Sequence, residues 1–296
     1  MLEDVRRNKF KTGIIVSIFI LVITLIVYYI CYAFDFGPMS IVIALIVSII
    51  SAWSSYYFSD KIVLSMSNAR PATEAEDKKI INILDALMVS SGLTTKPRLY
   101  VMESAQPNAF ATGRNPENAV ICVTTGLLEK LDYYELEGVI AHEMAHIKNY
   151  DIRLSAVLSV MVGLVVMLSD MFTRVFLFGD SDRESKGNPI LMIIGLVCLI
   201  LSPIFASLIQ LAVSRRREYL ADATAVEFTR NPQGLIDALL KLDNDDNRLD
   251  VESTATAHMY IVNPFKKGAK AKRKSTSLFS THPSIEDRVE ALRNIK

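Results

Sequence analysis

The stretch that decides the fold is Asp132–Asn149, with the sequence DYYELEGVIAHEMAHIKN. Gly138 is the only helix breaker among the residues that lead to the two histidines, so the stretch predicts one continuous helix. On such a helix His142 and His146 lie one turn apart on the same face, and Glu143 lies between them. We therefore expect two imidazoles and a carboxylate to meet at one point.

This spacing allows two imidazoles to bind one Zn²⁺, while the carboxylate beside them accepts a proton from a water that the metal acidifies. The alternative is a chance pattern on a core helix. With only 4 histidines in 296 residues, a chance match is rare. Buried histidines would also need polar partners, which neighbours such as Val139 and Ile140 do not supply. The pattern predicts His142 and His146 as zinc ligands and Glu143 as the catalytic base.

A catalytic zinc site needs a third protein ligand. Spacing alone leaves several candidates, among them His258, His282 and Glu218. Glu218 stands out because Asp222 lies one turn further along the same helix face, where it can accept the N–H of a ligand histidine. The same two carboxylates would also suit an ordinary surface helix next to arginines. Spacing therefore leaves the third ligand open.

The charges of this chain are unevenly distributed. Its 32 basic and 32 acidic residues give a net charge of +0, and the mean hydropathy is +0.29. Four stretches carry no charge: Gly13–Phe34, Pro38–Ser59, Leu154–Ser169 and Ile190–Val213. A membrane helix needs about 20 apolar residues, which the third stretch reaches when it is extended to Phe178. We predict four transmembrane helices, and exclude a fully soluble globule, a disordered chain and a disulfide scaffold.

Basic residues predict the orientation. The first stretch is too long for a cleaved signal peptide and leads directly into the second. The connector Asp35–Gly37 has no basic residue, whereas the flank before the first stretch carries Arg6, Arg7, Lys9 and Lys11. Arg183 and Lys186 in the second connector weaken the argument slightly. The positive-inside rule places both termini and the polar parts in the cytoplasm.

The chain thus divides into four parts. Residues 1–60 form an N-terminal transmembrane hairpin and 61–153 the first part of a cytoplasmic domain. Residues 154–213 form a second hairpin, and 214–296 complete the cytoplasmic domain. If the helices that carry the ligands are continuous with the second hairpin, the metal lies roughly 8–12 Å beyond the apolar stretches. The zinc should then sit just on the cytoplasmic side of the bilayer.

Local patterns in the polar parts predict a small sheet among helices. Helices are expected from Thr73 to Gly92, from Asp132 through Asn149, from Asn231 to Leu242, and after Pro283. Short β-prone segments are Pro97–Met102, Asn108–Thr112 and Ala119–Thr124.

The order of these features resembles the HtpX family of bacterial membrane zinc metalloproteases, which are relatives of the prenylated-protein (CaaX) endoproteases. The similarity covers nearly the whole chain. Besides the two apolar hairpins it rests on Asn108–Gly113, on His142–His146 followed by Asp151, on Ser214–Asp222, and on His282–Arg288.

The resemblance implies a mainly α membrane protein with four transmembrane helices and a zincin-like α+β cytoplasmic metalloprotease domain with a small sheet. It implies one Zn²⁺ per chain, Glu218 as the third ligand and Asp222 as the partner of a ligand histidine. A second donor to the oxyanion is expected, and the resemblance favours His282 with Arg288 as support, while His258 is the competitor. An edge strand that pairs with the substrate is implied for Asn108, Ala109, Phe110, Ala111 and Thr112.

The implied function is a zinc endopeptidase in the bacterial cytoplasmic membrane that cleaves misfolded membrane proteins at the cytoplasmic face, in quality control or stress response. The expected partners are the lipid bilayer and protein or peptide substrates, and no nucleic acid; the oligomeric state is left open. Two alternatives are a CaaX-type prenyl protease and a non-catalytic scaffold stabilised by zinc. An intramembrane protease is disfavoured because the helix of the two histidines carries Glu135 and Lys148.

Overall fold

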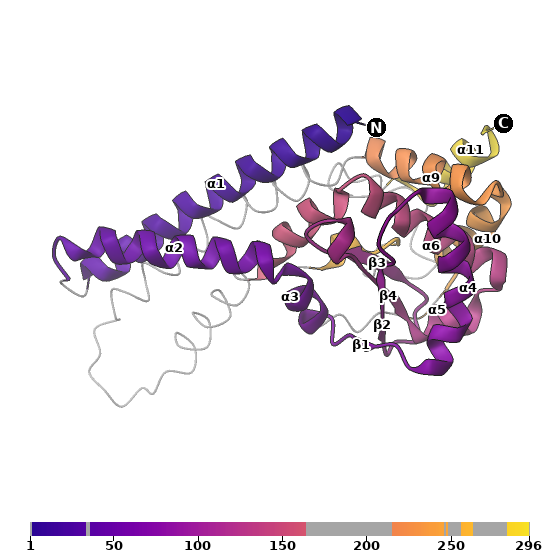
Figure 1. The fold of residues 1–296 in the computed structure, drawn as a ribbon, viewed down its shortest axis with the longest axis horizontal. Helices are drawn as coiled ribbons and strands as arrows, with labels where there is room; N and C mark the ends of the chain where they lie inside the picture. Colours follow the sequence, from indigo (N-terminus) through magenta and orange to yellow (C-terminus); the bar gives the residue numbers. More distant parts are fainter. Residues whose placement is uncertain are drawn as a thin grey trace.

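The computed structural model describes residues 2–33, 36–163, 215–245, 247, 256–262 and 283–295. A long helical hairpin extends from one side of a mixed α/β domain (Figure 1). The last predicted span, most of the third, and His282 lie outside the described residues.

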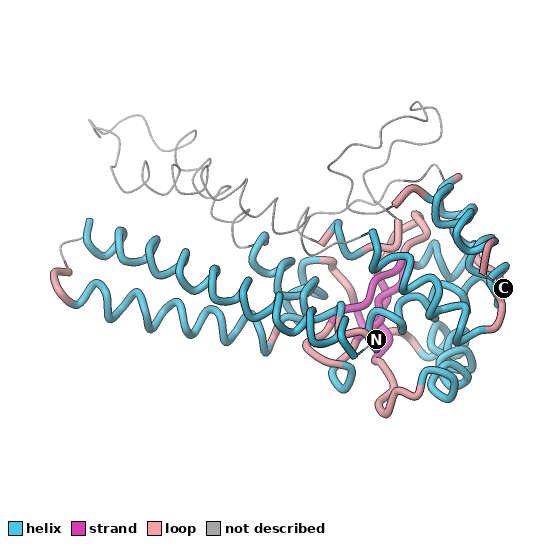
Figure 2. The backbone as a smooth tube through the Cα atoms, turned by 90° about the horizontal axis from the view of Figure 1, so that it is seen from above, coloured by secondary structure: helices cyan, strands magenta, loops and turns pink. Residues whose placement is uncertain are grey.

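The hairpin consists of α1 (Leu2–Ala33) and α2 (Met39–Tyr57). Within the described residues these are the two helices long and apolar enough to cross a membrane. They run side by side (Figure 2), and the Thr24 hydroxyl donates to the Ser48 hydroxyl across their interface at 2.9 Å. Large apolar side chains on the outer faces, such as Leu21 and Ile49, are exposed, as lipid contact requires.

The start of the third apolar stretch packs against this hairpin. Residues 151–163 are helical, and Leu158 and Met161 lie in one cluster with Phe19 of α1. The hairpin is therefore attached to the helix that follows the histidine-bearing segment. Two of the predicted spans are thus present as candidate membrane helices. Of the third, the structure describes only the first turns.

The domain contains a four-stranded mixed sheet with strand order β1-β2-β4-β3. Its strands are β1 (Arg70–Pro71), β2 (Arg98–Met102), β3 (Ala109–Thr112) and β4 (Val120–Thr124). Strand β4 is parallel to β2 and antiparallel to β3. Strand β3 is therefore an edge strand, and three of the four strands match the β-prone segments of the sequence.

Helices cover this sheet, and α6 lies at their centre. They are α3 (Ser59–Met66), α4 (Glu74–Ser91), α5 (Thr125–Lys130), α6 (Tyr133–Lys148), α9 (Arg215–Thr229), α10 (Pro232–Asp243) and α11 (Ile285–Arg293). Short 3-10 turns cover Pro116–Asn118 and Ala257–Met259. The expected capping boxes before α4 and α6 are both present. The sequence patterns missed β1, α3 and α5, which are short and lack a clear period.

Gly138, the helix breaker of α6, has a packing reason. A Cβ atom at this position would lie 2.7 Å from the backbone nitrogen of Leu235 in α10. Gly234 makes the reciprocal close approach, because its Cβ would lie 2.4 Å from the carbonyl oxygen of Tyr134. The two glycines let α6 and α10 pack backbone to backbone, which fixes the helix that carries both histidines.

The helix does not continue from the histidines into the third apolar stretch, which corrects the assumption of continuity. Helix α6 ends at Lys148, and Tyr150 has a left-handed backbone with φ of 59° before the helix of residues 151–163 begins. The break turns Asp151 back towards His146. A distance from the membrane calculated along one straight helix therefore does not apply on this side.

Candidate metal centre and active site

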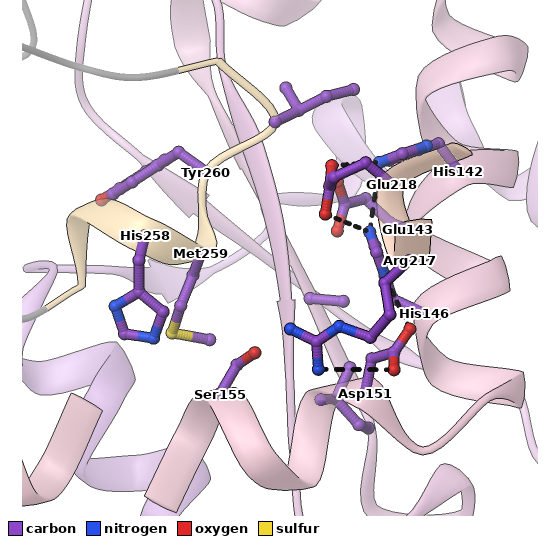
Figure 3. A pocket seen from close by; sticks show the side chains of 13 residues that line it. His142, Glu143, His146, Asp151, Ser155, Arg217, Glu218, His258, Met259 and Tyr260 are labelled. Carbon is purple, nitrogen blue, oxygen red and sulfur yellow. Dashed lines mark hydrogen bonds and ion pairs between the residues drawn. The ribbon is translucent and has the colours of Figure 1, made fainter. Parts of the chain in front are cut away.

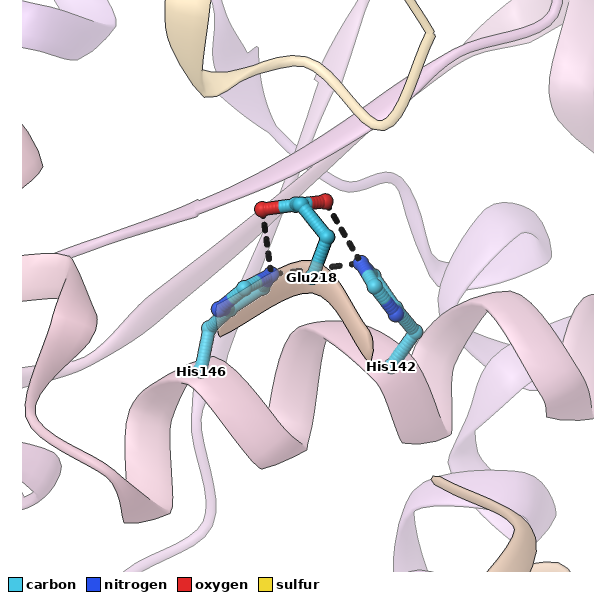
Figure 4. A group of neighbouring side chains, drawn as sticks. All are labelled: His142, His146 and Glu218. Carbon is cyan, nitrogen blue, oxygen red and sulfur yellow. Dashed lines mark hydrogen bonds and ion pairs between the residues drawn. The ribbon is translucent and has the colours of Figure 1, made fainter. Parts of the chain in front are cut away.

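Helices α6 and α9 bring three potential metal ligands to one point (Figure 4). The Nε2 atoms of His142 and His146 are 3.2 Å apart. The carboxylate of Glu218 faces both, with Oε2 3.8 Å from Nε2 of His142 and Oε1 3.8 Å from Nε2 of His146. One atom from each of these three residues lies within 4.8 Å of the others.

This group suits a divalent metal. In a tetrahedral zinc site, bonds of about 2.0–2.2 Å place neighbouring ligand atoms roughly 3.3 Å apart. The separation of 3.2 Å between the imidazole nitrogens matches that edge, and the carboxylate needs only a small movement. Two histidines and one glutamate form a known catalytic zinc set, which leaves a position open for substrate or water. His142, His146 and Glu218 therefore fit a metal.

His142 is held from behind by a buried ion pair. Its Nδ1 donates to Oδ1 of Asp222 at 3.0 Å. Arg288 donates from Nε and Nη2 to the two oxygens of the same carboxylate, at 2.9 and 2.6 Å, and from Nη1 to the Ile261 carbonyl at 3.2 Å. Side chains of all three residues are at most 2% exposed. We call His142, Asp222 and Arg288 the inner arm.

His146 has a matching carboxylate on its other side. Its Nδ1 donates to Oδ2 of Asp151 at 3.0 Å, and Asp151 lies just after the helix break. Nη1 of Arg217 lies 3.6 Å from Oδ1 of Asp151, beyond hydrogen-bond distance. The side chain of His146 is 16% exposed and lines a pocket in front of the three candidate ligands, together with Asp151 and Arg217. We call His146, Asp151 and Arg217 the outer arm.

Carboxylates that accept from both Nδ1 atoms leave the two Nε2 atoms facing each other, an arrangement that a cation bound between them would stabilise. Burial lowers the pKa of His142. Burial also lowers that of His146, but the hydrogen bond to Asp151 and the charge of Glu218 outweigh it and raise the pKa to about 9. A metal that binds here must therefore displace a proton from His146.

The inner arm keeps its carboxylate charged. Burial alone would raise the pKa of Asp222, but the charge of Arg288 and the hydrogen bond from His142 hold it below the ordinary value. Asp222 can thus orient His142 through its Nδ1 at any physiological pH.

Glu143 is buried beside the three ligands and lines the same pocket (Figure 3). Burial raises its pKa to about 7, and the backbone N–H of Ala111 donates to its carboxylate. Ala111 belongs to the edge strand β3, so the strand and the carboxylate meet at the pocket. A carboxyl group with a pKa near 7 can both take and return a proton.

The edge strand is partly covered at its start. The N–H of Ile261 donates to the Ala109 carbonyl at 3.0 Å, and the Asn108 side chain donates to the Val262 carbonyl at 2.8 Å. Phe110 packs on the other side against Tyr260, with ring centroids 5.1 Å apart. Of the predicted substrate-binding residues, only Ala111 lines the pocket, and Thr112 is buried.

The remaining predicted residues lie in different places. His258 lines the pocket on the wall opposite Asp151, next to Met259 (Figure 3). Arg288 is fully buried behind Asp222 and is not among the residues that line this pocket. The sequence patterns gave no role to Arg217, since it is hidden in a run of three arginines; its place next to Glu218 was the only available signal.

A helix with two histidine ligands, a glutamate between them and a third ligand from a second helix defines the class of metallopeptidases. The family model for peptidase family M48 matches residues 74–296. The chain is also 44% identical to the protease HtpX homolog of Dictyoglomus thermophilum over 98% of this chain and 93% of that protein. It is 40% identical to the homolog of Streptococcus gordonii over the full length of both.

The chain therefore belongs to peptidase family M48 and, within it, to the HtpX family of proteases. It is a membrane metalloprotease. Among solved structures, the crystal structure of S. mikatae Ste24p is similar with a TM-score of 0.49 and 18% identity, over 99% of this chain and 67% of that one.

Proposed function

We propose that this metalloprotease is a zinc endopeptidase of the bacterial cytoplasmic membrane that cleaves membrane proteins at the cytoplasmic face. The observation that carries the proposal is the convergence of His142, His146 and Glu218 next to the buried Glu143. Zinc bound by these three ligands would polarise the scissile carbonyl and acidify water. Glu143 would take the proton of the attacking water and return it to the leaving amine nitrogen.

The other residues would act around this centre. Asp222 and Asp151 orient the two histidines through their Nδ1 atoms. Arg288 would hold Asp222 from behind the ligands, and we propose that its support of the oxyanion is exerted through this carboxylate. We keep His282 as the second donor to the oxyanion, with His258 as the competitor in the pocket wall.

Strand β3 would bind the substrate backbone. Residues 109 and 111 direct their backbone groups away from β4, as shown by the bond from Ile261 to the Ala109 carbonyl. Because the segment 256–262 already uses Ala109 and the Ala111 N–H donates to Glu143, an extended peptide would pair with β3 from the Ala111 carbonyl onwards. Pairing through backbone groups gives loose sequence preference, which suits a protease for misfolded membrane proteins in quality control or stress response.

Basic residues support the proposed membrane orientation, and aromatic residues support the level of the interface. Arg6 precedes the first span, and Trp53, Tyr57 and Phe58 gather where α2 meets the domain. Arg114 lies over the ring of Tyr57, with 5.0 Å to the centroid. Aromatic and basic side chains at this level are typical of a membrane–water interface. We propose that both termini and residues 61–153 and 214–296 are cytoplasmic, with hairpins at 1–60 and 154–213.

The test uses the full chain purified in detergent, with casein as substrate and with zinc or a chelator. Glu143→Gln should lower cleavage by about 100- to 10,000-fold while zinc still binds. Glu137→Gln is the matched control, because Glu137 lies on the same helix outside the pocket. Zinc-dependent cleavage that persists in Glu143→Gln would overturn the assigned base. A scaffold would instead keep its cellular function in Glu143→Gln and lose it in His142→Ala.

A further inference from the structure

Arg217 is a buried cation in the wall of the catalytic pocket. Its side chain is 8% exposed, and it precedes the ligand Glu218 on α9. In Figure 3 its guanidinium points into the pocket from the side of Asp151. The neighbouring Arg215 and Arg216 are exposed, so the burial of Arg217 is specific to this position.

Two of the three guanidinium nitrogens of Arg217 lack hydrogen-bond acceptors within the part of the chain that the structure describes. Its Nε and Nη1 are buried without a hydrogen-bond partner, and the contact to Asp151 at 3.6 Å is too long for one. Arginine carries five N–H donors, and burying them without acceptors is costly. Water or a group that enters the pocket must therefore accept from Arg217.

Arg288 provides a comparison, because it is an arginine whose role is to hold a carboxylate. Arg288 donates to both oxygens of Asp222 and to the Ile261 carbonyl, and it stays out of the pocket. Arg217 makes no such bond to Asp151, which His146 holds at 3.0 Å. Supporting Asp151 thus does not explain why Arg217 faces the pocket.

The charges around Arg217 favour a neutral hydrogen-bond acceptor over a second carboxylate. Asp151 already supplies a negative charge next to Arg217, so this pair is neutral. A substrate carboxylate would add a second negative charge close to Asp151 and to the neighbouring Glu218. A carbonyl oxygen of the peptide backbone satisfies the N–H donors without this repulsion.

We propose that Arg217 binds a backbone carbonyl oxygen of the substrate on the His146 side of the metal centre. The substrate is then held through its backbone at two places, by Arg217 and by strand β3. Recognition of this kind does not depend on the substrate side chains. The proposal rests on the proposed function, because it assumes that a peptide occupies this pocket.

The test measures peptide binding separately from cleavage. The full chain in detergent with zinc carries Glu143→Gln to prevent turnover, and Arg217→Met is compared with Arg216→Met, the exposed neighbour on the same helix. The probes are two casein-derived peptides that differ only by Glu or Gln next to the cleaved bond. We expect Arg217→Met to weaken binding of both peptides by about 10- to 100-fold, with Arg217→Lys intermediate. Arg216→Met should bind both peptides as the parent does.

Zinc affinity is measured on the same proteins by competition with a chelator, and it should be unchanged in Arg217→Met. Equal peptide binding in Arg217→Met and Arg216→Met would overturn the proposal, since solvent would then satisfy the guanidinium. A loss confined to the Glu peptide would show recognition of a carboxylate and also overturn it. So would a parallel loss of zinc affinity, which indicates a merely structural role. A wild-type protein that binds but never cleaves would instead refute the proposed function alone.

Discussion

The two histidine ligands are supported by arms of the same composition but different construction. Each arm consists of a histidine, an aspartate that accepts from its Nδ1, and an arginine. In the inner arm Arg288 binds Asp222 through two hydrogen bonds and is fully buried. In the outer arm Arg217 stands 3.6 Å from Asp151 and faces the pocket.

The difference shows that the same three residue types can have different roles in the two arms. An ion pair in which all three guanidinium nitrogens donate hydrogen bonds fixes a ligand and ties α6, α9 and α11 together. An arm whose arginine has N–H groups without acceptors can donate hydrogen bonds to a molecule that enters the pocket. We therefore assign the inner arm to the framework, and we propose that the outer arm binds substrate.

The largest effect is expected for Arg288→Met. It leaves Asp222 buried without its countercharge, which costs about 3–5 kcal/mol of the free energy of unfolding. Arg217→Met should change the free energy of unfolding by about 1 kcal/mol or less, because the loss of a cation near Asp151 is offset by the removal of buried donors that have no acceptor. Unfolding of the full chain in detergent with a chelator measures both. Equal destabilisation by the two variants would remove the distinction between the arms.

Glu143 lies between the arms, and its ionised form should lower the free energy of unfolding of the metal-free protein. Its pKa rises from 4.5 to about 7 in the folded state, so ionisation opposes folding. Below about pH 4.5 the group is protonated in both states and has no effect. Above about pH 7 the cost is complete, at about 3 kcal/mol. Glu143→Gln should therefore be more stable than wild type at pH 8 with a chelator, and the gain should vanish near pH 4.5. A gain that does not depend on pH would contradict this.

The aspartates should differ less in their effect on the metal. Asp151→Asn and Asp222→Asn should each lower zinc affinity by about 10- to 100-fold, because each replaces the charged acceptor that orients a ligand with a neutral amide. Asp222→Asn should in addition reduce stability, since it leaves Arg288 without its partner. Chelator competition and unfolding separate the two effects. The comparison fails if Asp151→Asn destabilises the fold as much as Asp222→Asn.

The smallest effect is expected at the turn that delivers Asp151. Tyr150 has φ of 59°, a conformation that costs a residue with a Cβ about 1–2 kcal/mol, and its ring lies 5.5 Å from the guanidinium of Arg153. Tyr150→Gly relieves the backbone but loses this contact and adds chain entropy, so stability should change by about 1 kcal/mol or less. Zinc affinity should stay the same. A tenfold loss of affinity would show that the tyrosine itself positions Asp151.

Much of the fold was predictable because its signals are local. Thr73 and Asp132 cap their helices through side chains three residues away, and Gly92 ends its helix in a left-handed conformation. The strands at 98–102, 109–112 and 120–124 follow from short β-prone runs between turns. Periodicity could not find β1, because two residues show no period.

The candidate site also has a part that local spacing predicts and a part that depends on packing. The His142–His146 spacing forces two imidazoles onto one face, so the sequence alone defines that half of the metal centre. The contacts of Arg288 with Asp222 arise only when α11 packs against α9, so the sequence could not predict them. Arg217 could not be distinguished from its two exposed neighbours, because burial depends on which face of α9 meets the domain.

The sequence by itself determined the residues that lie one helical turn apart, the apolar stretches and the caps, since these depend on spacing along the chain. Only the tertiary structure decided which aspartate meets which histidine and that one arginine is saturated while the other faces the pocket. The break at Tyr150 decided that Asp151 turns back to His146. Asp222 and Arg288 are 66 positions apart, and the geometry of such contacts is set by packing, which spacing along the chain does not reveal.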